Sequence, residues 1–349
     1  MAGGNSAYVN VIDDLTLTAD VSVPVGVALI VTSGKTLTVD TGKTLDLTGG
    51  GLVLADNATL TVDGTVNAKG TVSSTSFGIV LMPGEVTTSM TINGSGIIHL
   101  KTPGNLLNIG KGQKLTLDGT ITLDGLRTIA AGGTDSNDAV NNSRGHVISV
   151  RGELDMKGGT ITGNYNTADY DGGGVEINGG DGGAAIFTMS GSAEVSGNRT
   201  LNGGAGVNVV HGGTFIMKGN AKISNNTADE GGGGVRINQG IYSSTTFTME
   251  GNAEISGNTA GTYGGGVWVR DGGDFVLKGG TINGSGEATN PNTVSGSGSG
   301  ASLYVDTGTA KWGDSSTSIS GGDGGGTAGG NILSGGGTGD TDDTLSAAG

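Results

Sequence analysis

The chain has 349 residues, of which 75 are glycine, 4 are proline and none is cysteine, and its formal net charge is −15. The lack of cysteine excludes disulfides, thiolate metal sites and a cysteine nucleophile. The negative charge disfavours nucleic acid and anionic membranes as partners. The sequence also contains no apolar run of roughly 18 residues, so we expect no transmembrane helix.

The first residues do not resemble a targeting segment. Residues 1–5 lack the basic and apolar regions of a signal peptide. Either the chain is a mature fragment or it is not exported, and we expect a fragment because the sequence begins and ends in glycine-rich material. The lack of cysteine is compatible with the cytosol and equally with bacterial proteins that are exported unfolded. We expect an extracellular or cell-surface location.

Residues 1–126 show short alternating segments that end in glycine turns, for example residues 36–42, 44–49 and 59–64. Alternation with β-branched residues between glycine, aspartate or asparagine turns indicates short strands. Three such units form a coil of roughly 20 to 24 residues. This part is predicted to be a short-coil β-solenoid.

Three further segments follow the first. Residues 127–145 are polar and are predicted to be a loop thrown out from one coil. Residues 146–312 carry longer repeats, interrupted by a Gly-, Ser- and Asn-rich loop at residues 286–300. Residues 313–349 have too few apolar residues to form much core, so we expect a weak final coil or a linker.

The longer repeats occupy residues 153–305 and follow the pattern F-x-M-x-G-x-A-x-[IV]-S-[GN]-N, then a polar loop, then G-G-G-V-x-[IV]. A period of 28 to 32 residues indicates a solenoid. Stacked coils place like residues on like residues at ~4.8 Å. We therefore expect the phenylalanines that open successive copies to form an aromatic stack, namely Phe187, Phe215, Phe247 and Phe275.

One asparagine ends the second strand of each copy, and these residues are expected to form a ladder: Asn164, Asn198, Asn226 and Asn258. Asparagine tolerates left-handed backbone geometry, and stacked amides can hydrogen-bond along the solenoid axis. A structural role therefore outweighs a ligand-binding role for these residues. The copy at residues 282–285 lacks the asparagine.

These motifs resemble a known family. Residues 161–164, 195–198, 223–226 and 255–258, each followed by a glycine-rich run that ends in valine, are similar to the paired FxxN and GGA[ILV] repeats of chlamydial-type polymorphic outer membrane proteins. An aliphatic residue replaces the phenylalanine, and GGGV replaces GGA[ILV]. The resemblance covers about 150–285 and implies the passenger of a repeat-rich bacterial surface protein with a pectin-lyase-like right-handed β-helix.

The middle residue of the third strand in each copy points away from the core, which places Arg236, Trp268 and Tyr304 in one outward column. Exposed Trp, Tyr and Arg side chains dominate interface hot spots and can stack on sugar rings. We name these three residues as candidate binding residues. The alternative is that Trp268 shields the surface beneath the loop after Gly286.

The acidic residues and the histidines give little support for catalysis. Polysaccharide hydrolysis needs paired carboxylates, and the acidic candidates Asp135, Asp138, Asp169 and Asp171 lie in loops, where solvation explains them. The three histidines are far apart in sequence, so we expect each to be isolated, with no metal site, no cofactor and no catalytic residue. These are His99, His146 and His211. Calcium binding by the Asp-rich loops stays open.

Thr-x-Thr pairs occur at positions 16/18, 36/38, 59/61, 120/122, 160/162 and 246/248. The spacing of the first three pairs suggests that they stack on one face, as in an ice-binding solenoid. Threonine is also simply a favourable strand residue. Ice binding is therefore the third hypothesis.

We predict an all-β fold, a single right-handed parallel β-helix with three short strands per coil and roughly a dozen coils. The favoured function is a non-enzymatic bacterial adhesin or structural stalk whose partner is a host or matrix protein or a glycan. The second hypothesis is a polysaccharide lyase or hydrolase. The oligomeric state stays open.

Overall fold

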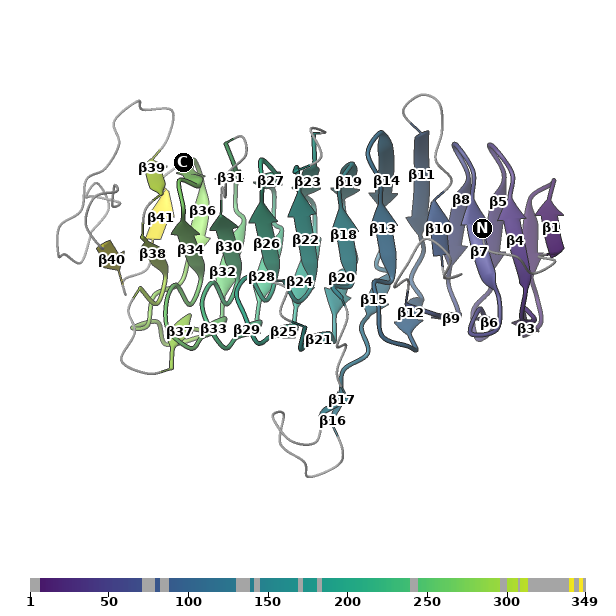
Figure 1. Cartoon of the computed structure of the whole chain (residues 1–349), viewed down its shortest axis with the longest axis horizontal. Coiled ribbons are helices and arrows are strands. Elements are labelled where there is room, and N and C mark those ends of the chain that lie inside the picture. Colours follow the sequence, from purple (N-terminus) through teal and green to yellow (C-terminus); the bar gives the residue numbers. More distant parts are fainter. Residues whose placement is uncertain are drawn as a thin grey trace.

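The computed structural model describes residues 7–70, 79–81, 88–129, 139–140, 145–168, 172–180, 184–238, 244–295, 300–306, 308–312, 339–341 and 345–347. Within these ranges the chain is all-β, and its strands stack along the long axis of the molecule (Figure 1). Neighbouring coils pair in parallel, so the predicted parallel β-helix is confirmed. Its right-handed sense stays a prediction.

Two sheets run the full length of the rod. Sheet 2 contains, in order, β2 (Leu15–Leu17), β5 (Thr36–Val39), β8 (Thr59–Val62), β11 (Thr88–Asn93), β14 (Gln113–Leu117), β19 (Glu153–Met156), β23 (Ile186–Met189), β27 (Thr214–Met217), β31 (Thr246–Met249), β35 (Asp274–Leu277) and β39 (Thr309–Trp312). Sheet 3 contains β3 (Val21–Ser22), β6 (Thr44–Asp46), β9 (Thr65–Ala68), β12 (Ile97–Leu100), β15 (Thr122–Asp124), β20 (Thr160–Thr162), β24 (Glu194–Ser196), β28 (Lys222–Ser224), β32 (Glu254–Ser256), β36 (Gly280–Ile282) and β41 (Leu345–Ala347).

The third side of the coil is divided between two sheets. Sheet 1 contains β1 (Ala7–Val11), β4 (Val27–Val31), β7 (Gly51–Leu54) and β10 (Ile79–Leu81). Sheet 4 contains β13 (Leu107–Ile109), β18 (Ile148–Val150), β22 (Val175–Asn178), β26 (Val207–Val210), β30 (Val235–Asn238), β34 (Val267–Arg270), β38 (Leu303–Val305) and β40 (Gly339–Thr341). The first coils therefore have the three strands predicted.

The later coils add a fourth, two-residue strand. It lies between sheets 3 and 4 and forms sheet 5, which contains β21 (Tyr165–Asn166), β25 (Arg199–Thr200), β29 (Thr227–Ala228), β33 (Thr259–Ala260) and β37 (Thr293–Val294). A short antiparallel pair, β16 (Thr128–Ile129) with β17 (Ala139–Val140), falls within the predicted polar loop and lies away from the body of the rod (Figure 1). The longer repeat thus makes a coil with an additional corner.

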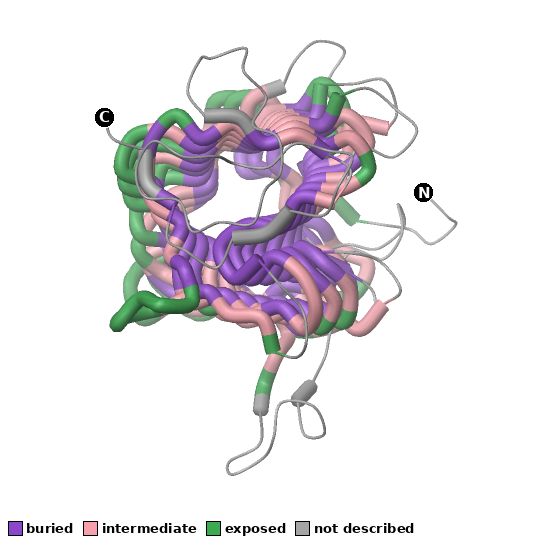
Figure 2. The backbone as a smooth tube through the Cα atoms, turned by 90° about the vertical axis from the view of Figure 1, so that its left-hand side faces the viewer, coloured by how far each residue is buried: buried purple, intermediate pink, exposed green. Residues whose placement is uncertain are grey.

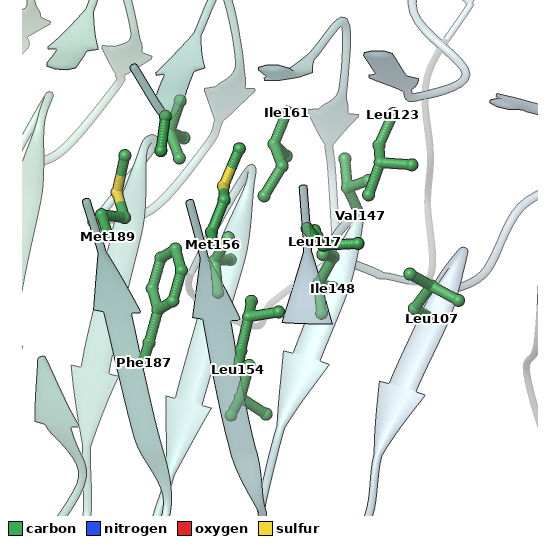
Figure 3. Packing of buried hydrophobic residues seen from close by; sticks show 14 of the residues in the cluster. Leu107, Leu117, Leu123, Val147, Ile148, Leu154, Met156, Ile161, Phe187 and Met189 are labelled. Carbon is green, nitrogen blue, oxygen red and sulfur yellow. The ribbon is translucent and has the colours of Figure 1, made fainter. Parts of the chain in front are cut away.

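A single apolar core runs through the described coils, with members from Leu17 to Leu345. Seen from the C-terminal end, buried residues line the inner side of the coils (Figure 2). Alternating residues of each strand point inward, so Leu154 of β19 packs beside Phe187 of β23, and Met156 beside Met189 (Figure 3). The same register continues along sheet 2.

The four repeat phenylalanines stack as expected. Their ring centroids are 5.1, 4.6 and 5.0 Å apart for Phe187 to Phe215, Phe215 to Phe247 and Phe247 to Phe275. These spacings follow the ~4.8 Å separation of adjacent strands, and they lie in the range that aromatic pairs favour. All four rings are fully buried.

The asparagines form a continuous ladder along the axis. The backbone N–H of Asn198 donates to Oδ1 of Asn226 at 3.0 Å, and the N–H of Asn226 donates to Oδ1 of Asn258 at 3.0 Å. Nδ2 of Asn198 and of Asn226 also donates to the next asparagine, and that of Asn226 donates in addition to the carbonyl of Val195 at 3.0 Å. The ladder therefore joins both backbone and side chain of one coil to its neighbours.

Two details of the ladder differ from the sequence-based expectation. The left-handed residue is the one before each ladder asparagine, as at Gly197 (φ 67°) and Asn225 (φ 56°), so the proposed backbone reason for asparagine was wrong. The copy at residues 282–285 also keeps its rung. After an insertion, Asn292 accepts from the Asn258 N–H at 2.9 Å, which the fixed spacing of the motif could not reveal.

Replacing one ladder asparagine tests whether the ladder holds the coils together. Asn226→Ala removes the acceptor of the Asn198 N–H and a donor to the Val195 carbonyl in a buried corner. We expect a loss of about 2 to 4 kcal/mol in the free energy of unfolding, because each buried unpaired polar group costs about 1 to 3 kcal/mol. Urea denaturation measures the loss. The matched control is Asn252→Ala, whose exposed amide makes a 3.4 Å hydrogen bond to Asn220, and equal losses would contradict the ladder's role.

Candidate functional site

The outward column of sheet 4 is not exposed. The register places Asn208, Arg236, Trp268 and Tyr304 on adjacent strands, as expected. Their exposed fractions are 1%, 5%, 3% and 6%. The expectation that Arg236, Trp268 and Tyr304 form an exposed column is therefore wrong.

Glycine backbone covers this column. A Cβ added to Gly231 would lie 2.5 Å from Cε3 of Trp268, and one added to Gly203 would lie 2.6 Å from Cδ of Arg236. The segment that precedes each sheet 4 strand thus folds back over the side chains of the neighbouring coil. Gly203 and Gly231 each lie one residue before the G-G-G-V positions, and their lack of a side chain permits an approach that any side chain would block. Alternation predicts which way a side chain points, but it does not show what covers it.

Trp268 lies between two arginines. The guanidinium carbon of Arg236 is 5.4 Å from the Trp268 ring centroid, and that of Arg270 is 4.8 Å from it. Tyr263 packs at 5.8 Å from the Trp268 ring and stacks on Tyr304 at 4.4 Å. We call these five residues the aromatic–arginine cluster.

Two members of the cluster face solvent, and neither was selected from the sequence. Tyr263 is half-buried, and the Arg270 side chain is 28% exposed. Arg270 contacts Asp271 at 2.8 Å and Glu230 at 4.0 Å, so its guanidinium is held over the indole by carboxylates on the same surface. Arg270 follows Trp268 by two residues, and this spacing was the available signal. Tyr263 lies in a polar loop, where no periodicity marks it.

The prediction that the histidines are isolated is wrong for two of them. Nδ1 of His99 lies 2.8 Å from Oδ2 of Asp124, on the adjacent strands β12 and β15 of sheet 3. Nε2 of His146 lies 3.4 Å from Oε2 of Glu176, and its Nδ1 lies 3.0 Å from the Gly172 carbonyl oxygen. Residues separated by one coil lie side by side on adjacent strands, and for His99 and Asp124 this separation is 25 residues.

Burial raises the pKa of Asp124, while its hydrogen bond to His99 and the charge of Lys101 oppose the rise. Both side chains of the pair are about 30% exposed, so the pair lies at the surface of sheet 3. A histidine oriented by a carboxylate through one ring nitrogen keeps the other nitrogen for a proton or a ligand. The His99–Asp124 pair is therefore a second candidate site among the described residues, after the aromatic–arginine cluster.

Charge pairing occupies a neighbouring column of sheet 3. Lys222 stands opposite Glu194 and Glu254 on adjacent strands, and its Nζ lies 3.1 Å from a carboxylate oxygen of Glu254. The pKa of Glu254 is lowered, first by a hydrogen bond from Ser256 and then by Lys222, against the effect of burial. This column is a solvated, charge-paired face.

The Thr-x-Thr pairs are spread over two sheets. The pairs at 36/38 and 59/61 stack in register on β5 and β8, but Thr16 stands opposite Thr38, one step out of that register. Thr122 and Thr160 lie in sheet 3, and the pair at 246/248 lies in β31, far along sheet 2. The first three pairs therefore share the outward face of sheet 2, as predicted, but the first pair is offset from the other two by two residues along the strand.

Some predictions fall outside the described residues, including those for Asp135, Asp138, Asp169 and Asp171. Within the described ranges no group of three or more His, Asp or Glu residues is placed to hold a metal ion. The same ranges contain no helix long and apolar enough to cross a membrane.

No family model matches the chain, and no curated protein or solved structure matches it.

The raised pKa of Asp124 predicts a pH dependence of stability. The folded state holds this proton more tightly than the unfolded chain, whose pKa is near 3.8. Stability contributed by Asp124 is therefore greatest below that value and falls as pH rises through the raised folded pKa. We expect Asp124→Asn to remove this fall.

Urea unfolding followed from about pH 3 to about pH 7 provides the measurement. Asp13→Asn, which changes a carboxylate whose side chain is 88% exposed, is the control. An identical pH profile for Asp124→Asn and the unaltered chain would show that the pair does not bind its proton more tightly in the folded state.

Proposed function

We propose that the chain is a non-enzymatic, rigid rod that acts at a bacterial cell surface as an adhesin or structural stalk. The observation that carries the proposal is the continuous axial bonding, in which strand ladders, stacked phenylalanines and the asparagine ladder join successive coils. Such a stack resists bending and separates whatever is attached at its two ends. Stiffness of this kind is what a stalk requires.

The adhesive surface in this proposal is the solvent-facing part of the aromatic–arginine cluster. Tyr263 and Arg270 are held in place by Tyr304 and Trp268 beneath them. A rigid tyrosine and an arginine lose little conformational entropy on binding, and residues of these types dominate interface energetics. Host or matrix proteins and glycans are the partner classes that this surface suits.

The binding test compares the unaltered chain with Tyr263→Ala and Arg270→Ala on a glycan array and on immobilised matrix proteins. We expect each variant to lose about tenfold or more in affinity, since truncating a hot-spot residue costs about 2 kcal/mol or more. Lys222→Ala is the matched control, because the Lys222 side chain is 53% exposed on sheet 3, outside the cluster. Unchanged binding by both cluster variants would reject this surface, and no binding by the unaltered chain would leave the stalk role alone.

A polysaccharide lyase or hydrolase is the second candidate, and the His99–Asp124 pair is the observation in its favour. A histidine held by a carboxylate is a plausible general base. Incubation with a panel of polysaccharides, assayed for unsaturated products and new reducing ends, separates the two candidates. Activity that His99→Ala abolishes would replace the stalk proposal, whereas inactivity across the panel supports it.

A further inference from the structure

His146 is a buried histidine whose hydrogen bonds place a proton on one ring nitrogen. It lies two residues before β18, and its side chain is 9% exposed. Its Nδ1 lies 3.0 Å from the carbonyl oxygen of Gly172, and the same oxygen accepts from Nδ2 of Asn166 at 2.8 Å. A carbonyl oxygen can only accept, so Nδ1 is the donor. Nε2 is therefore the ring nitrogen left for a second contact.

That second nitrogen faces a carboxylate at a distance too long for a good hydrogen bond. Nε2 of His146 lies 3.4 Å from Oε2 of Glu176, whereas N–H···O bonds span roughly 2.7 to 3.2 Å. With its proton on Nδ1, a neutral imidazole presents a lone pair at Nε2, and the carboxylate presents lone pairs as well. A proton or a metal ion must lie between two such acceptors.

A third buried polar group lies beside this pair. Asn208 stands opposite Glu176 on the adjacent strand β26 and is 1% exposed. Neither its Oδ1 nor its Nδ2 has a hydrogen-bond partner among the described residues. A Cβ built on Gly172 would lie 3.0 Å from Nδ1 of His146 and 3.3 Å from Cβ of Asn208, so both side chains flank the same glycine. A buried amide of this kind is destabilising unless something binds it.

The cationic side chain in the same column packs elsewhere. Arg236 stands opposite Asn208, but its guanidinium carbon lies 5.4 Å from the ring centroid of Trp268, which belongs to the following strand. Two strand spacings, about 9.6 Å, separate Arg236 from Glu176 along the column. The Glu176 carboxylate is 17% exposed and is open to a cation that enters from solvent.

The separation of the two facing atoms fits a tetrahedral metal ion. Zn–N bonds of about 2.0 to 2.1 Å and Zn–O bonds of about 2.0 to 2.2 Å, at the tetrahedral angle, place the two ligand atoms about 3.4 Å apart. Nε2 of His146 and Oε2 of Glu176 have this separation. A histidine that binds a metal ion through one nitrogen commonly donates the other N–H to a backbone carbonyl, as His146 does to Gly172.

We propose that Nε2 of His146, Oε2 of Glu176 and Oδ1 of Asn208 bind one divalent transition-metal ion of the Zn²⁺ type. Imidazole nitrogen combined with carboxylate and amide oxygens suits such an ion. A solvent molecule completes the four-coordinate set at the exposed edge of Glu176. The site needs one histidine and one carboxylate, so it is compatible with the lack of any described group of three His, Asp or Glu residues.

The ion would join three consecutive coils. His146 precedes β18, Glu176 lies in β22 and Asn208 lies in β26, and these strands are neighbours in sheet 4. The backbone N–H of His146 also donates to Oδ1 of Asn105 at 3.0 Å, which holds the histidine in place before the metal binds. The metal ion thus acts as a clamp at the start of the segment that carries the longer repeats.

Calorimetric titration of the full chain with Zn²⁺, after treatment with EDTA, tests the proposal. We expect one tight site per chain. His146→Ala is expected to weaken it by about 100-fold or more and Asn208→Ala by about tenfold or more, because even outer-shell changes cost a metal site about 10- to 100-fold. The matched control is His99→Ala, which alters another histidine–carboxylate pair and is expected to leave the tight site unchanged.

Three calorimetric results overturn the proposal. They are no zinc binding by the unaltered chain, loss of the tight site in His99→Ala, and equal binding by His146→Ala and the unaltered chain.

Nitrogen NMR of the unaltered chain covers the case in which His146→Ala disturbs folding. We expect Zn²⁺ to shift the Nε2 resonance of His146 while Nδ1 keeps its proton, and to leave the ring of His99 unchanged. A proton in place of the metal would give an imidazolium with both nitrogens protonated, which Zn²⁺ would not alter. That result, or a zinc-dependent shift confined to another histidine, also overturns the proposal.

Discussion

The register between successive coils is the constraint on which the rest of this structure depends. Each corner asparagine both accepts from the coil before it and donates to the coil after it, as Asn226 does between Asn198 and Asn258. A slip of one residue would break this ladder and turn the inward strand residues outward. The same register superimposes the phenylalanines, so one repeat supplies the backbone ladder, the amide ladder and the aromatic stack together.

The register also determines what the surface can offer. Most strand residues that point away from the core are partly exposed on sheets 2 and 3, where Lys222 and Glu254 form an ion pair at the surface. On sheet 4 the glycine segment before each strand covers the outward residues of the next coil. Arg236 and Trp268 are therefore buried outside the main core. The solvent-facing chemistry therefore moves to residues beside the strand, Tyr263 and Arg270, and to pairs formed across coils, such as His99 with Asp124.

The fold was predictable because its signal is periodic. The spacing of Phe187 and its equivalents defined the coil, and alternation identified the inward residues. The candidate site was less predictable because it depends on contacts that repeat spacing does not encode. The sequence did not indicate that glycine backbone covers Trp268. An insertion moved Asn292 away from the position that the motif spacing predicts for a ladder asparagine. A coil length of 25 residues could have paired His99 with Asp124, had the histidines been compared by coil position.

Hydrogen exchange of the corner amides tests the central claim most directly. The backbone N–H groups of Asn198, Asn226 and Asn258 lie outside the strands, yet each donates to the asparagine of the next coil. The account predicts that they exchange as slowly as the amides of the adjacent strands in sheet 3, because opening them requires separating two coils. Exchange as fast as that of the exposed residues 285–290 would show that the corners are not joined, and would contradict the account.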